Sequence, residues 1–185
     1  MKKLSPVLLV LVVVLLSAPA GFAQEKVDNP VYQNWAKFKP GTMVKYAQTS
    51  EMMGNKTQSE VAYTLLEVTP EKVVIEMGGS TVIMGNQTEM PKTRIEYPAK
   101  ADAADPNVKS AINAKTSQSE EEIEVAGGKI RCKVFETTVE QQGSQIKSRF
   151  WSSDDVPGTL VKSETTMEKP VQSVTVLALV EKVIK

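Results

Sequence analysis

The residue types that most often carry catalysis and metal binding are scarce in this chain. It has no histidine and a single cysteine, Cys132. Ser-His-Asp and Cys-His catalysis and most zinc and copper(II) sites need histidine, so these chemistries are excluded. A lone cysteine in an exported protein can be a reactive thiol or an intermolecular link. Because Cys also behaves as a small hydrophobe, we instead expect Cys132 to be a buried strand residue.

Carboxylates that are adjacent in the sequence occur at Glu120 to Glu122 and at Asp154-Asp155. Neighbouring strand residues point to opposite faces, so they do not form a catalytic pair. Asp154-Asp155 precedes Pro157-Gly158 and is typical of a turn. We interpret the glutamates as a solvated face paired with basic residues, with a cation site as the alternative. No phosphate loop or metal-ligand spacing is present, so the sequence predicts a protein that is not an enzyme and has no metal site and no cofactor.

Two nearly identical stretches, MGNKT from Met53 and MGNQT from Met84, contain the N-x-Thr pattern of an N-glycosylation site. The chain has eight methionines, and Met52 and Met90 lie near these stretches. Thioethers are suitable copper(I) ligands, but methionines also fill cores and line adaptable surfaces. We favour a plainer interpretation in which each stretch forms the turn of a hairpin.

Residues 1–23 have the pattern of a secretory signal peptide. Lys2 and Lys3 are followed by an apolar run from Val7 to Leu16 and by small residues up to Ala23. This run is too short for a bilayer core, which needs roughly 20 apolar residues. We expect cleavage after Ala23, with Ala20 as the alternative, and a soluble exported protein, periplasmic or extracellular.

The remaining chain, residues 24–185, has the length of one domain. It carries 20 basic and 22 acidic residues, so it has no basic surface of the kind that binds nucleic acid. Its later apolar runs have the length of strands, and we expect no membrane-spanning segment. The sequence therefore predicts a single exported domain that binds no nucleic acid.

Gly54-Asn55 and Gly85-Asn86 are predicted to be the turns of two hairpins, because Gly and Asn tolerate positive φ. The first turn sets a register with one apolar face, in which the facing pairs are Val44 and Leu65, Tyr46 and Tyr63, and Gln48 and Val61. In the second hairpin, Gly78-Gly79 and Pro91 predict a bulge or an edge position.

A third hairpin is predicted to turn at Gly127-Gly128 and a fourth at Gln142-Gly143. In the third hairpin the predicted pairs are Val125 with Ile130, Ile123 with Cys132, Glu124 with Arg131, and Glu122 with Lys133. In the fourth hairpin they include Val139 with Ile146, Phe135 with Phe150, and Val134 with Trp151. The strand that the two hairpins share has apolar residues on both faces. We interpret this as a bulge near Val134 rather than as a sheet covered on both faces.

Helices are predicted at two places only. Asp28 or Asn29 would cap a short N-terminal helix that has Pro30 at its first position and Val31, Trp35 and Phe38 on one face. A second short helix is possible near residues 106–113, after Asp105. The remaining sequence favours strands, and Ser173 to Ile184 is apolar on both faces, as in a strand with a central or covered position.

Three segments also resemble a known architecture. GGKIRCKVFE, KSRFWSSDDVPGTLVK and NWAKFKPGTMVKY are similar to segments of uncharacterised exported bacterial proteins with a lipoprotein-carrier-like fold. The resemblance implies a strongly bent antiparallel meander that forms a half-open barrel, with helices over its concave side. Proteins of that architecture with known roles bind lipids or acyl chains in the concavity. It implies no catalytic residues.

These patterns predict a non-enzymatic exported binding protein with an apolar groove for a lipid-like or other hydrophobic small molecule. The candidate lining residues are Val44, Tyr46, Tyr63, Leu65, Ile123, Val125, Ile130 and Trp151. The same residues could form a filled core. In that case the chain would be a structural or interaction module of the cell envelope, with a cell-envelope protein as its partner.

Overall fold

The computed structural model describes residues 26–83, 85–103, 119–141, 144–168 and 172–185. The elements, in chain order, are β1 (Lys26–Asp28), α1 (Pro30–Trp35), β2 (Met43–Met52), β3 (Asn55–Val68), β4 (Lys72–Ile83), β5 (Asn86–Pro98), β6 (Lys100–Asp102), β7 (Ser119–Val125), β8 (Gly128–Gln141), β9 (Ser144–Ser152), β10 (Leu160–Met167) and β11 (Ser173–Val183). The predicted signal peptide and the possible helix near 106–113 lie outside the described residues.

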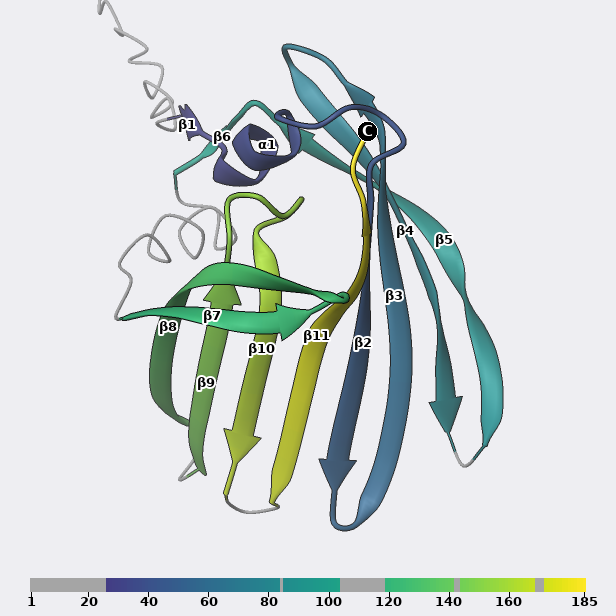
Figure 1. Ribbon diagram of the computed structural model, residues 1–185, viewed down its shortest axis with the longest axis vertical. Coiled ribbons are helices and arrows are strands. Elements are labelled where there is room, and N and C mark those ends of the chain that lie inside the picture. Colours follow the sequence, from purple (N-terminus) through teal and green to yellow (C-terminus); the bar gives the residue numbers. More distant parts are fainter. Residues whose placement is uncertain (1–25, 84, 104–118, 142–143, 169–171) are drawn as a thin grey trace, which may run out of the picture.

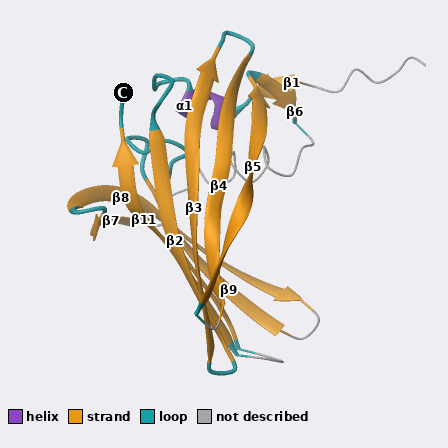
Figure 2. Cartoon of the chain, turned by 90° about the vertical axis from the view of Figure 1, so that its right-hand side faces the viewer, coloured by secondary structure: helices purple, strands orange, loops and turns teal. Residues whose placement is uncertain are grey.

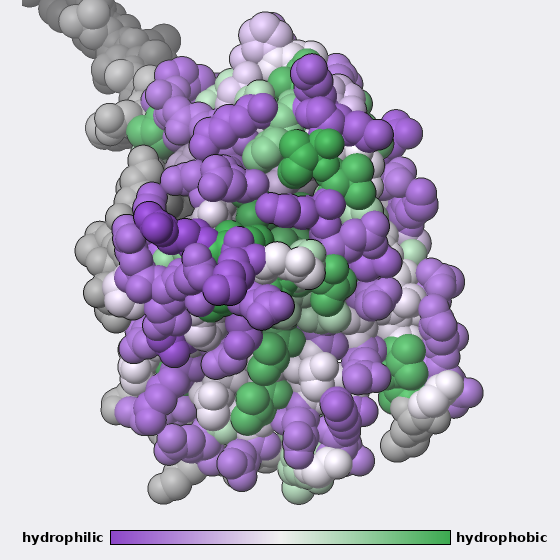
Figure 3. All heavy atoms as spheres, viewed as in Figure 1, coloured by the Kyte–Doolittle hydropathy of each residue, from purple (hydrophilic) through white to green (hydrophobic). Residues whose placement is uncertain are grey.

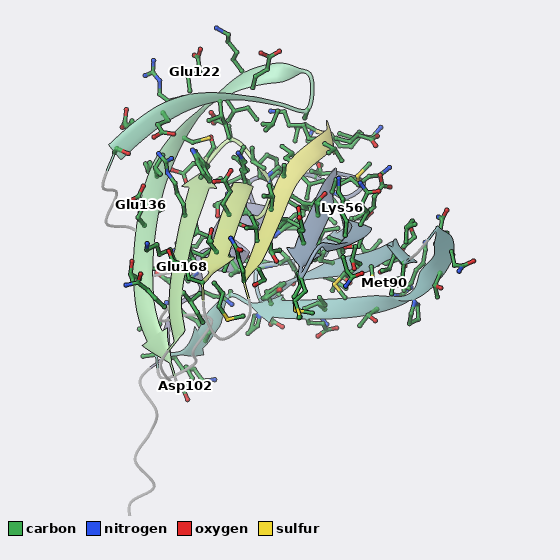
Figure 4. All side chains as sticks on the ribbon, turned by 90° about the horizontal axis from the view of Figure 1, so that it is seen from below. Lys56, Met90, Asp102, Glu122, Glu136 and Glu168 are labelled. Carbon is green, nitrogen blue, oxygen red and sulfur yellow. The ribbon has the colours of Figure 1, made fainter. Side chains whose placement is uncertain are left out.

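One antiparallel sheet of nine strands dominates the fold, in the order β5-β4-β3-β2-β11-β10-β9-β8-β7 (Figure 1). It bends strongly without closing into a barrel, and Figure 4 shows the strands following an open arc. The mainly β, half-open fold predicted from the sequence is confirmed. The sheet consists of two meanders, β2 to β5 and β7 to β11, joined by the pairing of β2 with β11. As predicted, β11 is therefore central.

The N-terminal helix is confirmed. Asn29 is its N-cap, with the side-chain Oδ1 accepting from the Val31 amide at 3.0 Å, and Pro30 stands in the first turn, where a missing N–H costs nothing. Trp35 is buried in the core, and Val31 and Phe38 pack against it. Before the helix, β1 pairs with β6, and Val27 lies opposite Ala101. This small sheet and α1 lie at the same end of the molecule (Figure 2).

Three hairpin turns lie one residue earlier than predicted. Met52 pairs with Asn55, so the first turn is Met53-Gly54, with φ of 53° and 79°. Ala126-Gly127 forms the corresponding turn between β7 and β8, with φ of 51° and 72°, and Ile83 pairs with Asn86 across the turn of the β4–β5 hairpin. Glycine takes the second central position of each turn, which is also its position in the favoured Asn-Gly turn. Asn55, which follows Gly54, is therefore not part of the turn and is the first residue of β3.

The shift changes each partner by two residues, so the predicted faces are preserved. Val44 pairs with Tyr63 rather than Leu65, and Ile123 pairs with Ile130 rather than Cys132. The other corrected pairs are Tyr46 with Val61, Gln48 with Ser59, Val125 with Gly128, Glu124 with Lys129, and Glu122 with Arg131. Acidic and basic residues still face one another, as the interpretation of the glutamate run requires.

The β4–β5 hairpin is irregular in the way its sequence predicts. Its register shifts between Met77 and Gly79, which is the predicted bulge, and β5 is an edge strand. A Cβ at Gly79 would lie 2.0 Å from the Glu60 carbonyl oxygen, so the close approach of β3 requires glycine here.

The register of β8 with β9 is as predicted, with Val134 opposite Trp151 and Phe135 opposite Phe150. The predicted bulge near Val134 is wrong, because neither ladder of β8 shifts at that point. Val134 and Phe135 are adjacent and both buried, so this part of the strand is covered on its two faces. The β7–β8 hairpin then lies across the sheet, in front of β9 and β10 in Figure 1.

The hydrophobic core lies in the half of the sheet near α1, where Trp35, Leu65, Ile75 and Leu179 are buried together. Tyr46 is also buried there, and its hydroxyl donates to the Leu160 carbonyl oxygen at 2.8 Å. Burial, together with nearby Tyr63, raises the pKa of Tyr46, so the hydroxyl remains a neutral donor. Within the described part of the chain, no helix is both long and apolar enough to cross a membrane.

Candidate functional site: a cavity beside α1

A cavity of about 440 Å³ lies between α1, the strands β8 and β9, and the turn that leads into β10. Its lining combines apolar, amide, hydroxyl and charged side chains: Pro30, Val31, Gln33, Asn34, Lys37, Lys133, Phe135, Ser152, Asp154, Gly158 and Thr159. Small-molecule sites typically measure roughly 300–1,000 Å³, so the cavity is large enough for a ligand.

Helix α1 forms one wall, and it is fixed from both sides. The Asn29 side chain donates through Nδ2 to the Pro98 carbonyl oxygen at 2.9 Å, which ties the start of the helix to the end of β5. The Tyr32 hydroxyl donates to the Thr69 carbonyl oxygen at 2.8 Å, in the turn between β3 and β4. These bonds give the wall a defined position although the helix has only six residues.

The opposite wall is the turn from Ser153 to Thr159. The Ser153 amide donates to the Thr159 carbonyl oxygen at 2.8 Å, and the Thr159 amide donates to that of Val156 at 2.8 Å. Gly158 has φ of 80°, and a Cβ there would lie 3.4 Å from the Trp35 indole nitrogen. Glycine therefore permits both the backbone conformation and the contact with α1.

Asn34 connects the two walls and leaves one hydrogen-bond donor unused. It is only 4% exposed, and its Oδ1 accepts from the Gly158 amide at 2.6 Å. The Gly158 N–H is a donor, so it must face the oxygen, and this fixes the assignment of the side-chain nitrogen. Nδ2 is buried and has no partner among the described residues. An unsatisfied buried donor costs about 1–3 kcal/mol.

The charged side chains of the lining are two lysines and one aspartate. Lys133 Nζ lies 3.2 Å from Asp154 Oδ2, and both side chains are more than half exposed, so the pair is at the mouth of the cavity. Lys37 is exposed and forms no ion pair with another described residue. The lining therefore carries one net positive charge.

All eight residues predicted to line an apolar groove belong to the core. Val44, Tyr46, Leu65, Ile130 and Trp151 are buried in one cluster, and Tyr63, Ile123 and Val125 are partly buried and pack against it. The structure thus brings the predicted residues together. None of them lines the cavity beside α1 or a second, polar cavity on β2 to β5. Their predicted contact with a ligand stays a prediction.

Trp151 occupies a polar setting within this cluster. It is 3% exposed, and its indole nitrogen donates to Glu121 of β7 at 2.9 Å. The Arg149 guanidinium and the Lys162 ammonium lie 4.7 and 4.8 Å from the ring centroid, distances typical of cation–π contacts. Glu121 also forms an ion pair with Arg149. The middle glutamate of the acidic run therefore anchors the β7–β8 hairpin, whereas Glu122 points away from the sheet (Figure 4).

Cys132 is a buried strand residue, as predicted. Burial and the Glu121 carboxylate raise the pKa of its thiol, which keeps it in the less nucleophilic protonated form. Among the described residues, no three His, Cys, Asp or Glu side chains gather as a metal site. Met52 and Met53 are exposed at the β2–β3 turn, and Met90 lies on β5; Met84 lies outside the described residues.

The sequence offers little to identify the cavity beside α1. It predicts Phe135 and Lys133 as strand residues and Asp154 as a turn residue, but nothing in their spacing places them beside Asn34. Comparison with known proteins adds no assignment, because no family model and no curated protein matches this chain. The resemblance to lipoprotein-carrier-like proteins therefore stays a prediction.

Proposed function

We propose that this protein is a non-enzymatic binding protein that holds a small hydrophobic or lipid-like molecule in the cavity beside α1. The observation that carries the proposal is the cavity itself, about 440 Å³ between a fixed helix, two strands and a turn. Pro30, Val31 and Phe135 provide apolar contact area, and the amide and charged groups provide a few convergent polar contacts. This combination is typical of small-molecule sites.

The proposed site differs from the predicted one because the bent sheet is filled where it is most apolar. Leu65 and Val161 have no exposed surface, and Val44 and Leu179 have almost none. A packed core has no room for an acyl chain without displacing side chains, which would remove their contacts. The cavity beside α1 needs no such displacement.

The experiment is a binding measurement with a cavity-filling variant. Native mass spectrometry of the purified chain would reveal a co-purified ligand, and a fluorescent acyl probe would report an affinity. The variant Ser152→Phe places a ring in the lining, whereas Ser148→Phe places one on the same face of the same strand outside it. We expect Ser152→Phe to weaken probe binding at least about tenfold and Ser148→Phe to preserve it. Absence of ligand and probe binding in the unmodified protein would contradict the proposal.

A second candidate, an interaction module of the cell envelope, is favoured by exposed apolar side chains. Met52, Met53 and Ile83 are 52%, 76% and 55% exposed at the ends of two hairpins, and Val174 and Val180 are exposed on β11. Figure 3 shows hydrophobic side chains between hydrophilic ones on the face that the β7–β8 hairpin crosses. A cell-envelope protein that co-purifies in stoichiometric amount with the unmodified chain, and that no longer co-purifies with the variant Met53→Asp, would favour this candidate.

Both candidates presuppose export to the periplasm or the cell exterior. The basis is the charge and hydropathy pattern of residues 1–23. N-terminal sequencing of the chain recovered from the exported fraction tests this, and we expect it to begin at Gln24. A chain that retains Met1 in the cytoplasm would contradict it.

A further inference from the structure

We propose that the cavity beside α1 recognises a ligand by a singly charged carboxylate head group, with the apolar body of the ligand against Val31 and Phe135. This inference rests on the proposed function and adds the chemical class of the ligand. It follows from the donors, the charge and the polarity of the lining.

The hydrogen-bonding capacity of the cavity is biased toward donors. Asn34 lines the cavity, and its Nδ2 is buried without a partner among the described residues, while its oxygen is committed to the Gly158 amide. A ligand that accepts hydrogen bonds would satisfy Asn34, whereas a ligand that only donates would leave its N–H groups unpaired.

The charges select the sign and the size of the head-group charge. Lys37 and Lys133 line the cavity together with one carboxylate, Asp154, which is already paired with Lys133 at 3.2 Å. The single excess positive charge complements one negative charge and leaves half of a dianion such as a phosphate monoester unbalanced. Hydrogen bonds to a charged acceptor are stronger than neutral ones, so the head group contributes substantially to affinity.

The lining also provides a place for an apolar body. Val31 and Pro30 lie on α1, and Phe135 lies on β8. Phe135 is buried but is not a member of the core cluster, and its ladder partner is Phe150 of β9. The aromatic side of the cavity is therefore separate from the filled core of the sheet. A molecule with one charged end and one apolar end matches this division.

The test compares three probes that share one alkyl chain: decanoate, decanol and decyl phosphate. Calorimetric titration of the full exported chain should give an affinity for decanoate that is about tenfold or more above the affinity for decanol. The affinity for decanoate should also be higher than the affinity for decyl phosphate. Lys37→Gln should reduce the preference for decanoate over decanol about fivefold, because it removes the lining cation that has no ion-pair partner among the described residues. Lys39→Gln, which removes an exposed lysine just outside the lining, should leave the preference unchanged.

A second variant addresses the buried amide. Asn34→Asp keeps the oxygen that accepts from Gly158 but replaces the free N–H donor with an oxygen, so it should lower decanoate affinity without lowering decanol affinity. Circular dichroism of each variant confirms that the fold is intact. Equal affinity for decanoate and decanol would overturn the head-group inference while the proposed function stands, and tighter binding of decyl phosphate would also overturn it. If no probe binds, the proposed function fails as well.

Discussion

The β2–β3 and β7–β8 hairpins have the same kind of turn and different surroundings. In each turn both central residues have positive φ and the second of them is glycine. These residues are Met53-Gly54 in the first hairpin and Ala126-Gly127 in the second. The β2–β3 turn is exposed, with Met53 at 76%, whereas Ala126 packs against the core and Glu121 of β7 bonds to Trp151. The turn therefore sets the register of each hairpin, and side chains beyond the turn decide where the hairpin lies.

Removing the indole to which the β7–β8 hairpin is anchored should have the strongest effect. Trp151→Ala should destabilise the protein by about 3–5 kcal/mol, because a buried indole and its contacts are lost. Met53→Ala, at the tip of the other hairpin, should change stability by less than about 0.5 kcal/mol. Urea unfolding followed by circular dichroism measures both. Similar losses in the two variants would contradict the assigned difference between the hairpins.

The two turns themselves should respond alike. A Cβ at Gly54 or at Gly127 would meet no atom within 4 Å, so each Gly→Ala change introduces only the strain of positive φ. We expect each to cost about 1–2 kcal/mol in the free energy of unfolding, measured in the same urea titration. A difference larger than that range would show that the two turns do not share one conformation.

A more modest loss is expected from neutralising Glu121. Glu121→Gln keeps an acceptor for the Trp151 indole but removes the ion pair with Arg149, and both ionic side chains are about one third exposed. After allowing for screening by solvent, we expect a loss of about 1 kcal/mol. Amide hydrogen exchange in β7 should become about fivefold faster, while exchange in β3 stays unchanged. Unchanged exchange in β7 would show that Glu121 does not anchor the hairpin.

The weakest effect should be a gain in stability. Met53 has φ of 53°, a conformation that Asn tolerates better, so Met53→Asn should stabilise the protein by about 0.5 kcal/mol. Ala126→Asn should gain less, since Ala126 also packs against the core. Thermal unfolding of the two variants measures the difference, and a larger gain at Ala126 would argue against its packing role.

Features set by local chemistry can be predicted from the sequence. The Asn29 cap with Pro30 gives the helix, alternation gives the strand faces, and the β8–β9 register follows from its apolar pairs. The predicted positions of three of the four hairpin turns are wrong by one residue. A turn at Gly-Asn puts glycine at the first central position, whereas the structure has glycine at the second.

Features set by long-range contacts cannot be predicted in this way. The pairing of β2 with β11 joins residues more than 120 positions apart, and no local pattern identifies it. The same holds for Asn34, which meets Gly158 across a separation of 124 residues. Apolar faces identify the core residues correctly, but they do not distinguish a filled core from a groove, because both require the same side chains.

Whether a ligand occupies the cavity beside α1 can be tested by an amide NMR titration with decanoate. We expect chemical-shift changes that saturate at Asn34, Phe135 and Gly158, with little change at Val44 and Leu65 in the core. Changes that concentrate on Val44, Tyr63 and Leu65 would instead place the ligand in the groove predicted from the sequence and contradict the proposed site. No saturable change at any of these positions would also contradict it.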